Sequence, residues 1–389
     1  MNIIVSKGNE MLLETYLYTH KWNKALNSSL DSPNTLVIIF ASSKIDRIKD
    51  AFLEVTTHFK SSIIIGASTA GEIYQDEFYE DSLVVSVMKF EHSRLKHSTC
   101  SLISSANSFE NGKHIANELY ADDLEGIFIL SDGLNANGSK LTEGISSVLP
   151  PHLPVTGGLA GDGDRFEKTW VVINNQLLSG FVCAIGFYGK NVHIAHASKG
   201  GWDRLGIERI VTKSKDNILY ELDKQPALEI YKKYLGEKAD GLPATGLLFP
   251  LELREEADSK ESKVRTILAV DEEAQSITFA GDIPEGSHVT LMKANYNRLI
   301  DGASEAAEHL NLEDYQEEEI LSIAISCVGR RLVLKSRVEE ELEAILDVIP
   351  QKAKQIGFYS YGEISPLSSG KCDLHNQTMT LTLIWESDA

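Results

Sequence analysis

One pattern of elements occurs three times along the chain, and it constrains the fold more than any other feature of the sequence. In each copy, a short apolar run precedes apolar residues at helical spacing, a second apolar run and a loop ending in glycine and an acid. The loops read GASTAGE at 66–72, TGGLAGD at 156–162 and GFYSYGE at 357–363. Continuous apolar runs are typical of strands buried on both faces. Each copy therefore predicts a strand, a helix, a parallel strand reached by a right-handed crossover, a glycine loop and an antiparallel strand.

The three copies leave a different segment between the second and the third. A common strand-helix-strand-loop-strand arrangement is expected for residues 30–100, 120–198 and 318–386. Residues 200–310 break the pattern, with several short strand-like stretches and one helical stretch. The sequence thus predicts an α/β fold of two layered domains with mixed sheets, the first at 30–225 and the second at 226–389.

The charge of the chain argues against two classes of partner. Its 389 residues include 37 basic and 57 acidic side chains, which gives a formal net charge of −20. Such a surface repels phosphate backbones and anionic lipid, so we expect neither nucleic acid nor a membrane as a partner. The four cysteines form no Cys-x-x-Cys pair, and the sequence carries no signal peptide pattern and no long apolar run. We therefore expect a cytoplasmic protein without disulfides.

The glycine loops are the predicted ligand site. Loops after the carboxyl ends of strands are where ligands bind in open α/β sheets, and glycine lets a ligand approach the backbone. We expect the three loops to face a shared cleft between the domains, with ligand contacts from Ser68, Thr69, Glu72, Asp162, Tyr359, Tyr361 and Glu363. The alternative is that glycine and acid only build a tight turn whose carboxylate accepts hydrogen bonds from local N–H groups.

Enzyme and metal motifs find little support. Residues 66–70 nearly match the Gly-x-Ser-x-Gly nucleophile elbow, but Ala70 stands in place of the last glycine. The chain contains no phosphate-binding P-loop and no dinucleotide fingerprint. Cys372 and His375 lie close in sequence, but further zinc ligands are not evident. We expect a binding protein, and an enzyme that uses the Gly-acid loops remains an alternative.

Several segments together resemble one known family. They include GASTAGEI at 66–73, VTGGLAGDGD at 155–164, LYELD at 219–223 and LHNQT at 374–378. In order and number they are similar to the FIST (F-box and intracellular signal transduction) proteins, with an amino-terminal and a carboxyl-terminal FIST domain. The resemblance covers most of the chain.

The resemblance implies a function in sensing. FIST domains are regarded as intracellular sensory modules for small ligands. Some stand-alone bacterial members are haem proteins that bind nitric oxide and regulate a partner histidine kinase or cyclic-di-GMP signalling. For this chain we therefore expect a haem b cofactor, nitric oxide as the ligand and a histidine kinase or a cyclic-di-GMP signalling protein as the partner. A sensor of an amino-acid-like metabolite without haem is the alternative.

Haem needs an axial ligand, and two histidines are candidates. A neutral imidazole must reach the iron within a largely apolar pocket. His375 is the first choice, because it enters the last strand of the third copy within LHNQT. His196 is the second, near Gly200, Gly201 and Trp202. The alternative for each is an ordinary hydrogen-bonded histidine.

Overall fold

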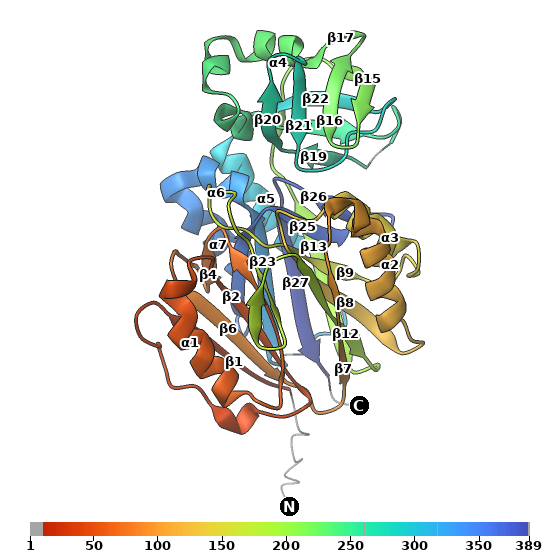
Figure 1. Ribbon diagram of the computed structural model, residues 1–389. Coiled ribbons are helices and arrows are strands. Elements are labelled where there is room, and N and C mark those ends of the chain that lie inside the picture. Colours follow the sequence, from red (N-terminus) through yellow and green to blue (C-terminus); the bar gives the residue numbers. More distant parts are fainter. Residues whose placement is uncertain (1–10, 260, 317, 388–389) are drawn as a thin grey trace, which may run out of the picture.

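The computed structural model describes residues 11–259, 261–316 and 318–387. Two parts are evident in Figure 1, a larger body below and a smaller lobe above. The body comprises the described residues of 11–202 and 294–387, and the lobe those of 203–293. Both parts contain mixed or antiparallel sheets covered by helices, which confirms the predicted α/β class.

The body contains three sheets of six strands each. The first sheet has the order β1 (Leu12–Tyr18), β6 (Leu83–Lys89), β2 (Thr35–Ser42), β3 (Ile63–Thr69), β10 (Val171–Ile173) and β11 (Gln176–Leu178). The second has the order β7 (Arg94–Ser101), β12 (Phe181–Tyr188), β8 (Leu124–Ser131), β9 (Val155–Leu159), β25 (Gly362–Pro366) and β26 (Cys372–His375). The third has the order β13 (Val192–Lys199), β27 (Met379–Glu386), β23 (Ile320–Cys327), β24 (Lys354–Ser360), β4 (Glu72–Tyr74) and β5 (Glu77–Tyr79).

The three sheets share one arrangement, in which a hairpin from each copy pairs with the edge of another copy's sheet. Every sheet has a parallel pair and an antiparallel strand from one copy at its centre. The hairpin β4–β5 of the first copy pairs with β24 of the third. The hairpin β10–β11 of the second pairs with β3 of the first, and β25–β26 of the third pairs with β9 of the second. The exchange is cyclic, so two of the three sheets combine strands from both sides of residue 226.

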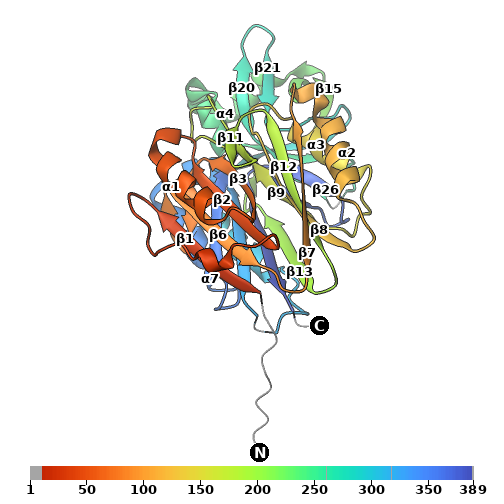
Figure 2. The ribbon, with the colours of Figure 1, turned by 60° about the horizontal axis from the view of Figure 1, so that its bottom comes forward.

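Helices cover the outer faces of the sheets, and an apolar core fills the space between them. The crossovers within the copies are α1 (Ile45–His58), α3 (Gly138–Ser146), and α6 (Val328–Leu334) with α7 (Val338–Leu346). The helices α2 (Ser108–Leu119) and α5 (Tyr296–Glu308) lead into the second and third copies. Figure 2 shows α1 on one outer side of the body and α2 and α3 on another. The central core joins all three sheets, and the rings of Phe40 and Phe358 lie 4.6 Å apart within it.

Glycines let the parallel strands approach each other in every copy. Gly66 pairs with Ile39, Gly157 with Ile129 and Gly357 with Ala324. A Cβ atom at these glycines would lie 2.4, 1.8 and 1.9 Å from the partner's carbonyl oxygen, which is closer than any side chain tolerates. These loop-proximal glycines therefore serve strand packing.

The Gly-acid loops meet at the end of the body that faces the lobe, where backbone hydrogen bonds join them in a ring. Ala70 N donates to Tyr359 O at 2.8 Å, and Gly161 N donates to Ser68 O at 2.9 Å. The ring closes with Tyr361 N, which donates to Leu159 O at 3.2 Å.

The lobe is built around one sheet of nine strands. Its continuous order is β19 (Lys263–Arg265), β18 (Leu251–Arg254), β22 (His288–Lys293), β15 (Arg209–Lys215), β16 (Ile218–Leu222), β21 (Ser276–Phe279) and β20 (Ile267–Asp271). The short strand β14 (Asp203–Arg204) pairs with β22, and β17 (Gln225–Pro226) pairs with β16. One face carries α4 (Ala227–Leu235), which continues into the 3₁₀ turns η3 (Gly236–Gly241) and η4 (Ala244–Leu248). Further 3₁₀ turns of the chain are η1 (Ser28–Leu30), η2 (Ser105–Asn107) and η5 (Lys335–Arg337).

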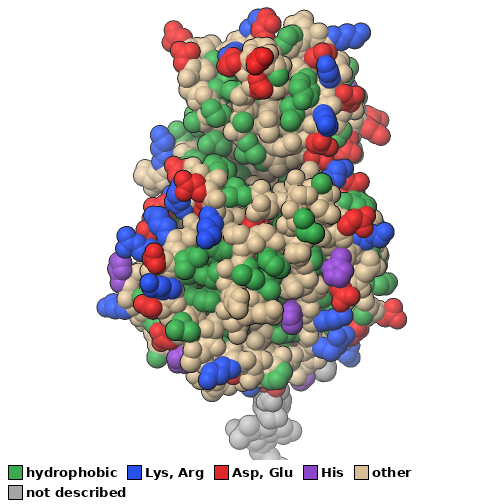
Figure 3. All heavy atoms as spheres, in the orientation of Figure 1, with side chains coloured by type: hydrophobic (Ala, Val, Ile, Leu, Met, Phe, Trp, Pro, Cys, Tyr) green, Lys and Arg blue, Asp and Glu red, His purple; other side chains and the backbone are tan. Residues whose placement is uncertain are grey.

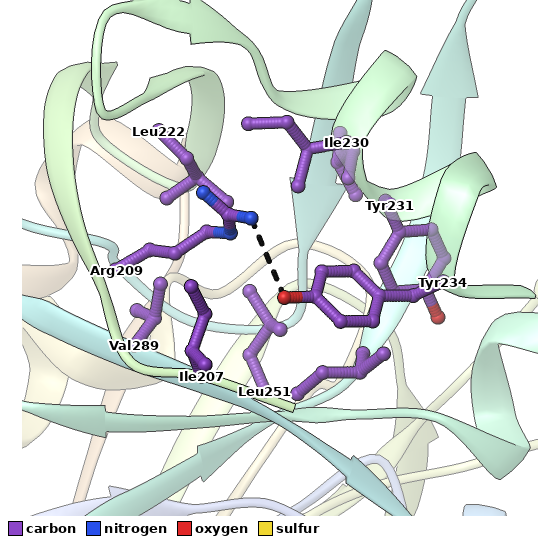
Figure 4. Close-up of a pocket in the computed structure, with 10 residues that line it drawn as sticks. Ile207, Arg209, Leu222, Ile230, Tyr231, Tyr234, Leu251 and Val289 are labelled. Atoms are coloured by element: carbon purple, nitrogen blue, oxygen red, sulfur yellow. Dashed lines mark hydrogen bonds between the residues drawn. The ribbon is translucent and has the colours of Figure 1, made fainter. Parts of the chain in front are cut away.

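The interior of the lobe is close-packed. Figure 4 shows a hollow between α4 and the sheet, where Arg209 Nη2 donates to Tyr234 Oη at 3.4 Å. Its volume is about 20 Å³, which is room for one water molecule and not for a ligand.

None of the helices in the described residues is long and apolar enough to cross a membrane. Nor do the same residues contain a cluster of three or more side chains suited to hold a metal ion.

Candidate functional site

A wide cleft lies between the lobe and the body. It has a volume of about 920 Å³, and its walls come from η3, η4 and β20 of the lobe and from α5, α6 and residues 164–166 of the body. The walls are mostly apolar and include Phe166, Leu242, Leu247, Leu268, Tyr296 and Leu332. Figure 3 shows hydrophobic side chains gathered at this waist between lobe and body. A concave apolar surface between two parts of a protein is typical of a small-molecule site.

The cleft adjoins a smaller and more polar hollow, which we call the inner chamber. Its volume is about 300 Å³, and Phe166, Leu247 and Leu268 border both spaces. Polar lining groups of the inner chamber come from both parts of the molecule and include Asn137, Asn217, Thr266, Asp282 and Tyr361.

Large hydrophobic side chains remain exposed around these two spaces. Phe166 is 45 % exposed, Leu268 40 % and Tyr296 46 %, and Leu134 at the inner chamber is 37 % exposed. Single exposed apolar side chains are normal on a protein surface, but their concentration around one concavity marks a binding surface.

Asp162 builds the loop that carries Phe166. Its carboxylate accepts hydrogen bonds from the backbone N–H groups of Phe166, Glu167 and Lys168, each at 2.9 Å. Phe166 adopts a left-handed backbone conformation with φ of 54°, which is costly for a bulky residue and persists where the surroundings impose it. Its ring stacks on that of Tyr361, with centroids 4.6 Å apart and planes at 15°. The loop thus presents an aromatic pair at the junction of cleft and inner chamber.

The electrostatics of this loop favour an ionised Asp162. Burial alone would raise the pKa of Asp162, but hydrogen bonds from Lys168 N, Tyr361 Oη and Glu167 N outweigh it and lower the pKa. Burial, and then the hydrogen bond to Asp162, raise the pKa of Tyr361. The Tyr361 hydroxyl therefore stays protonated and donates to Asp162 and to the carbonyl oxygen of Gly163.

A buried arginine connects the floor of the cleft with both links between body and lobe. Arg330 lies on α6, whose Leu332 and Val333 border the cleft. Its guanidinium donates to the carbonyl oxygen of Gly200, just before the lobe, and to that of Leu299, just after it. It also pairs with Glu341 on α7 at 2.7 Å, and both side chains of this pair are fully buried.

Two of the predicted carboxylates, Glu72 and Glu363, play matching parts in their copies. Glu72 accepts from the hydroxyl of Thr69 and from N and Oγ of Ser82, the residue before β6. Glu363 accepts from the hydroxyl of Ser360 and from N and Oγ1 of Thr378, the residue before β27. Burial raises the pKa of Glu72 to about 7 and that of Glu363 to about 8, against the hydrogen bonds that lower both. Each carboxyl therefore connects the loop of its copy, by hydrogen bonds, with the start of the third strand, which is β6 in the first copy and β27 in the third.

The second copy achieves the same connection with a residue that the sequence analysis missed. Asp132 directly follows β8, and its Oδ2 accepts from N of Gly180, the residue before β12, at 2.7 Å. Its Oδ1 accepts from Leu134 N, Asn135 N and the Thr169 hydroxyl. The second copy therefore keeps the hydrogen bond to the residue before its third strand, but its carboxylate comes from the end of the first strand. Asp162 is then available to hold the loop at Phe166.

The predicted ligand residues do not all face one space. Tyr361 lines the inner chamber, and Asp162 accepts a hydrogen bond from its hydroxyl. Thr69 and Glu72 border a separate polar hollow of about 70 Å³, beside Lys44 and Arg331.

The other predicted ligand residues are buried in contacts within the body. Ser68 Oγ accepts from Trp170 N at 3.0 Å, and Tyr359 Oη donates to Glu341 at 2.7 Å. Glu363 is fully buried among Ser360 and Thr378.

The two candidate histidines lie away from the walls of the cleft. His375 is 8 % exposed in β26, with its Nε2 at 3.1 Å from the carbonyl oxygen of Ser365, and burial lowers its pKa. His196 lies half-buried in β13, paired with Thr382, and burial lowers its pKa also. Neither imidazole borders the cleft or the inner chamber, so these residues do not fit an axial ligand for a haem bound there.

The main walls of the cleft were absent from the sequence analysis. Leu242, Leu247 and Leu268 belong to the lobe, where the repeat pattern gives no guide. Phe166 lies only four residues beyond the TGGLAGD loop, but its role depends on the hydrogen bonds of Asp162.

Comparison with protein-family models agrees with the resemblance of the motifs. The FIST N domain model matches residues 35–225, and the FIST C domain model matches residues 227–366. An uncharacterized protein of Methanocaldococcus jannaschii is 24 % identical over 391 residues, covering 90 % of this chain and 73 % of its own length. Among solved structures, a cyanuric acid hydrolase from A. caulinodans matches with a TM-score of 0.36 and 6 % identity, over 97 % of this chain and 100 % of that one. The two domain models together span most of the sequence, and the chain therefore belongs to the FIST family, whose domains are small-ligand sensors in signal transduction.

Proposed function

We propose that the protein senses a small ligand held in the cleft between the lobe and the body, rather than in a site formed by the Gly-acid loops alone. The observation that carries the proposal is the gathering of exposed hydrophobic side chains around a concavity of about 920 Å³. A ligand there contacts both parts of the molecule, so its binding favours one relative position of lobe and body.

The contacts of α6 supply a route for the signal. Leu332 and Val333 border the cleft, and Arg330 on the same helix holds both chain segments that lead to the lobe. A ligand that displaces α6 alters the hydrogen bonds of Arg330 and so the attachment of the lobe. We propose binding in place of catalysis, because the carboxyl groups near the loops are committed to backbone and hydroxyl donors.

The first experiment tests the cleft with an apolar dye. Nile red is neutral and fluoresces in apolar surroundings, and we expect it to bind the protein with a signal that Leu268→Asp largely removes. The reason is that a carboxylate in the cleft wall disfavours burial of apolar surface. Leu53→Asp is the matched control, since Leu53 is 64 % exposed on α1, away from the cleft. Equal loss in both variants, or in neither, would contradict the proposal.

Haem, nitric oxide and a partner histidine kinase form a more specific version of this proposal, which the family resemblance implies. The size and apolar walls of the cleft suit a flat aromatic molecule, whereas His375 and His196 do not fit as its iron ligands. The visible spectrum of protein expressed with adequate haem tests this version. A Soret band that Leu268→Asp removes and that His375→Ala and His196→Ala leave unchanged would support haem in the cleft. Absence of a Soret band from the wild-type protein would reject it.

A further inference from the structure

Thr266 carries a buried hydroxyl that is not used by any other described residue. It connects β19 and β20, lines the inner chamber and is only 4 % exposed. Within the described residues its Oγ1 has no hydrogen-bond partner. Burial of a hydroxyl without a partner costs about 1–3 kcal/mol, and a ligand group that bonds to it would offset this cost.

Charged groups near the inner chamber already have partners. Asp282 is the ionisable carboxyl on its lining, and its two oxygens lie 3.1 Å from Asn137 Nδ2 and 3.7 Å from Lys140 Nζ. Lys140 also pairs with Glu143 at 2.8 Å.

The nearby guanidinium of Arg265 does not line the inner chamber and is bound by backbone carbonyl oxygens. Its Nε donates to Asp282 O at 3.0 Å and its Nη1 to Leu374 O at 3.1 Å. Burial lowers the pKa of Arg265, although the charges of Asp373 and Asp282 act in the opposite direction. An ionised ligand group would lose its hydration in the inner chamber without gaining a free counter-ion. The inner chamber therefore favours a polar group that carries no charge.

The adjoining cleft favours an apolar group. Phe166, Leu247 and Leu268 border both spaces, so a ligand that lies across this junction places one end among the cleft walls and the other beside Thr266 and Tyr361. Tyr361 donates its hydroxyl hydrogen to Asp162 and to the carbonyl oxygen of Gly163, whereas Thr266 can donate or accept.

We propose that the ligand is a neutral amphiphile, with an apolar body in the cleft and an uncharged hydroxyl or primary amide beside Thr266 in the inner chamber. This inference rests on the proposed function, because it takes the cleft as the ligand site, and it is an alternative to haem, whose two propionates are ionised at neutral pH. It adds the chemical class of the ligand and names Thr266 as a residue that selects it.

The test compares four probes with one apolar chain and different head groups. Decan-1-ol, decanamide, decanoate and decylamine compete with Nile red on the full-length protein at neutral pH. We expect the alcohol and the amide to bind at least about tenfold more tightly than the two ions, since a charge without a counter-ion in the inner chamber is disfavoured. Decanoate or decylamine binding as tightly as the alcohol would overturn the neutral head group while leaving the cleft in place.

A pair of variants locates the head group. Thr266→Val removes one hydroxyl from the inner chamber, and we expect it to weaken the alcohol about three- to tenfold with no change for Nile red. Thr382→Val removes an equally buried hydroxyl, also without a partner among the described residues, from β27, away from both spaces, and is the matched control that should change neither. Unchanged alcohol binding in Thr266→Val would show that the Thr266 hydroxyl does not contact the ligand, and would overturn its assignment as the residue that binds the head group. If no probe displaces the dye and Leu268→Asp has no effect on it, the proposed function itself fails.

Discussion

The body and the lobe differ in how their strands are held together. In the body, each copy completes the sheet of another copy through an exchanged hairpin, and the central core draws on all three sheets. The lobe has one sheet and its own apolar core, and the chain reaches it through the segments near Gly200 and Leu299. Exchanged strands make the body one cooperative unit, whereas the lobe can change its position without loss of its own pairing. A cleft between two such parts can respond to a ligand.

The largest effect is expected where the two parts are joined. Glu341→Gln leaves the charge of Arg330 buried without its counter-ion, and we expect a loss of about 3–5 kcal/mol in the free energy of unfolding. Urea denaturation measures it. Glu340→Gln is the control, because its pair with Arg337 is partly open to solvent, with side chains 45 % and 35 % exposed, and should contribute nothing measurable. A Glu341 variant as stable as its control would show that the buried pair does not secure the junction.

The second prediction separates the two cores. Leu219→Ala deletes a fully buried side chain from the lobe, and we expect the lobe to lose about 2–5 kcal/mol while the body is unaffected. Hydrogen exchange followed by mass spectrometry should show faster exchange in the strands of the lobe alone. Ile323→Ala in the central core of the body is the counterpart and should increase exchange in all three sheets. Uniform exchange throughout the molecule in both variants would mean that body and lobe unfold together.

The third prediction concerns pH and compares the copies within the body. The pKa values of Glu72 and Glu363 are raised to about 7 and about 8 from the ordinary 4.5, so the folded protein binds these protons more tightly than the unfolded chain. Stability should therefore fall as pH rises above about 4.5 and level off beyond the folded pKa values, by an amount of order a few kcal/mol.

Substitutions test which carboxyls cause this decline. Glu72→Gln and Glu363→Gln should each remove part of it when unfolding is measured over this pH range. Asp162→Asn should leave the decline in place, because the pKa of Asp162 is lowered and its contribution is lost only in acid. A pH profile unaltered by both glutamate substitutions would contradict these shifts.

The repeated elements were predictable because their signals are local. The apolar run at 36–40 and the helical spacing that follows it correspond to β2 and α1, and the same holds for the other two copies. The Gly-acid segments were placed only in part, because the first four residues of each continue the second strand of its copy, and only the last three lie beyond it. A strand buried on both faces appears as a continuous apolar run, and a close approach of two strands appears as a glycine. Both patterns lie within about ten residues, so they can be recognised in a single sequence.

The exchange of hairpins was not predictable from these patterns. Ile73 pairs with Gly357, far along the chain, and nothing in the residues of β4 distinguishes this partner from a strand of its own copy. The role of Asp132 was missed for a similar reason, since its hydrogen bond to Gly180 joins two strand ends that the repeat pattern treats separately.

The sequence by itself determined the α/β class, the three copies and the FIST family, because these depend on periodicity and on motifs in a given order. Only the tertiary structure decided where the hollows between lobe and body lie. Phe166, Thr266 and Leu268 become neighbours of one hollow through the placement of the lobe on the body. Such a placement results from contacts between residues far apart in sequence, and a pattern that extends over a few residues carries no information about it.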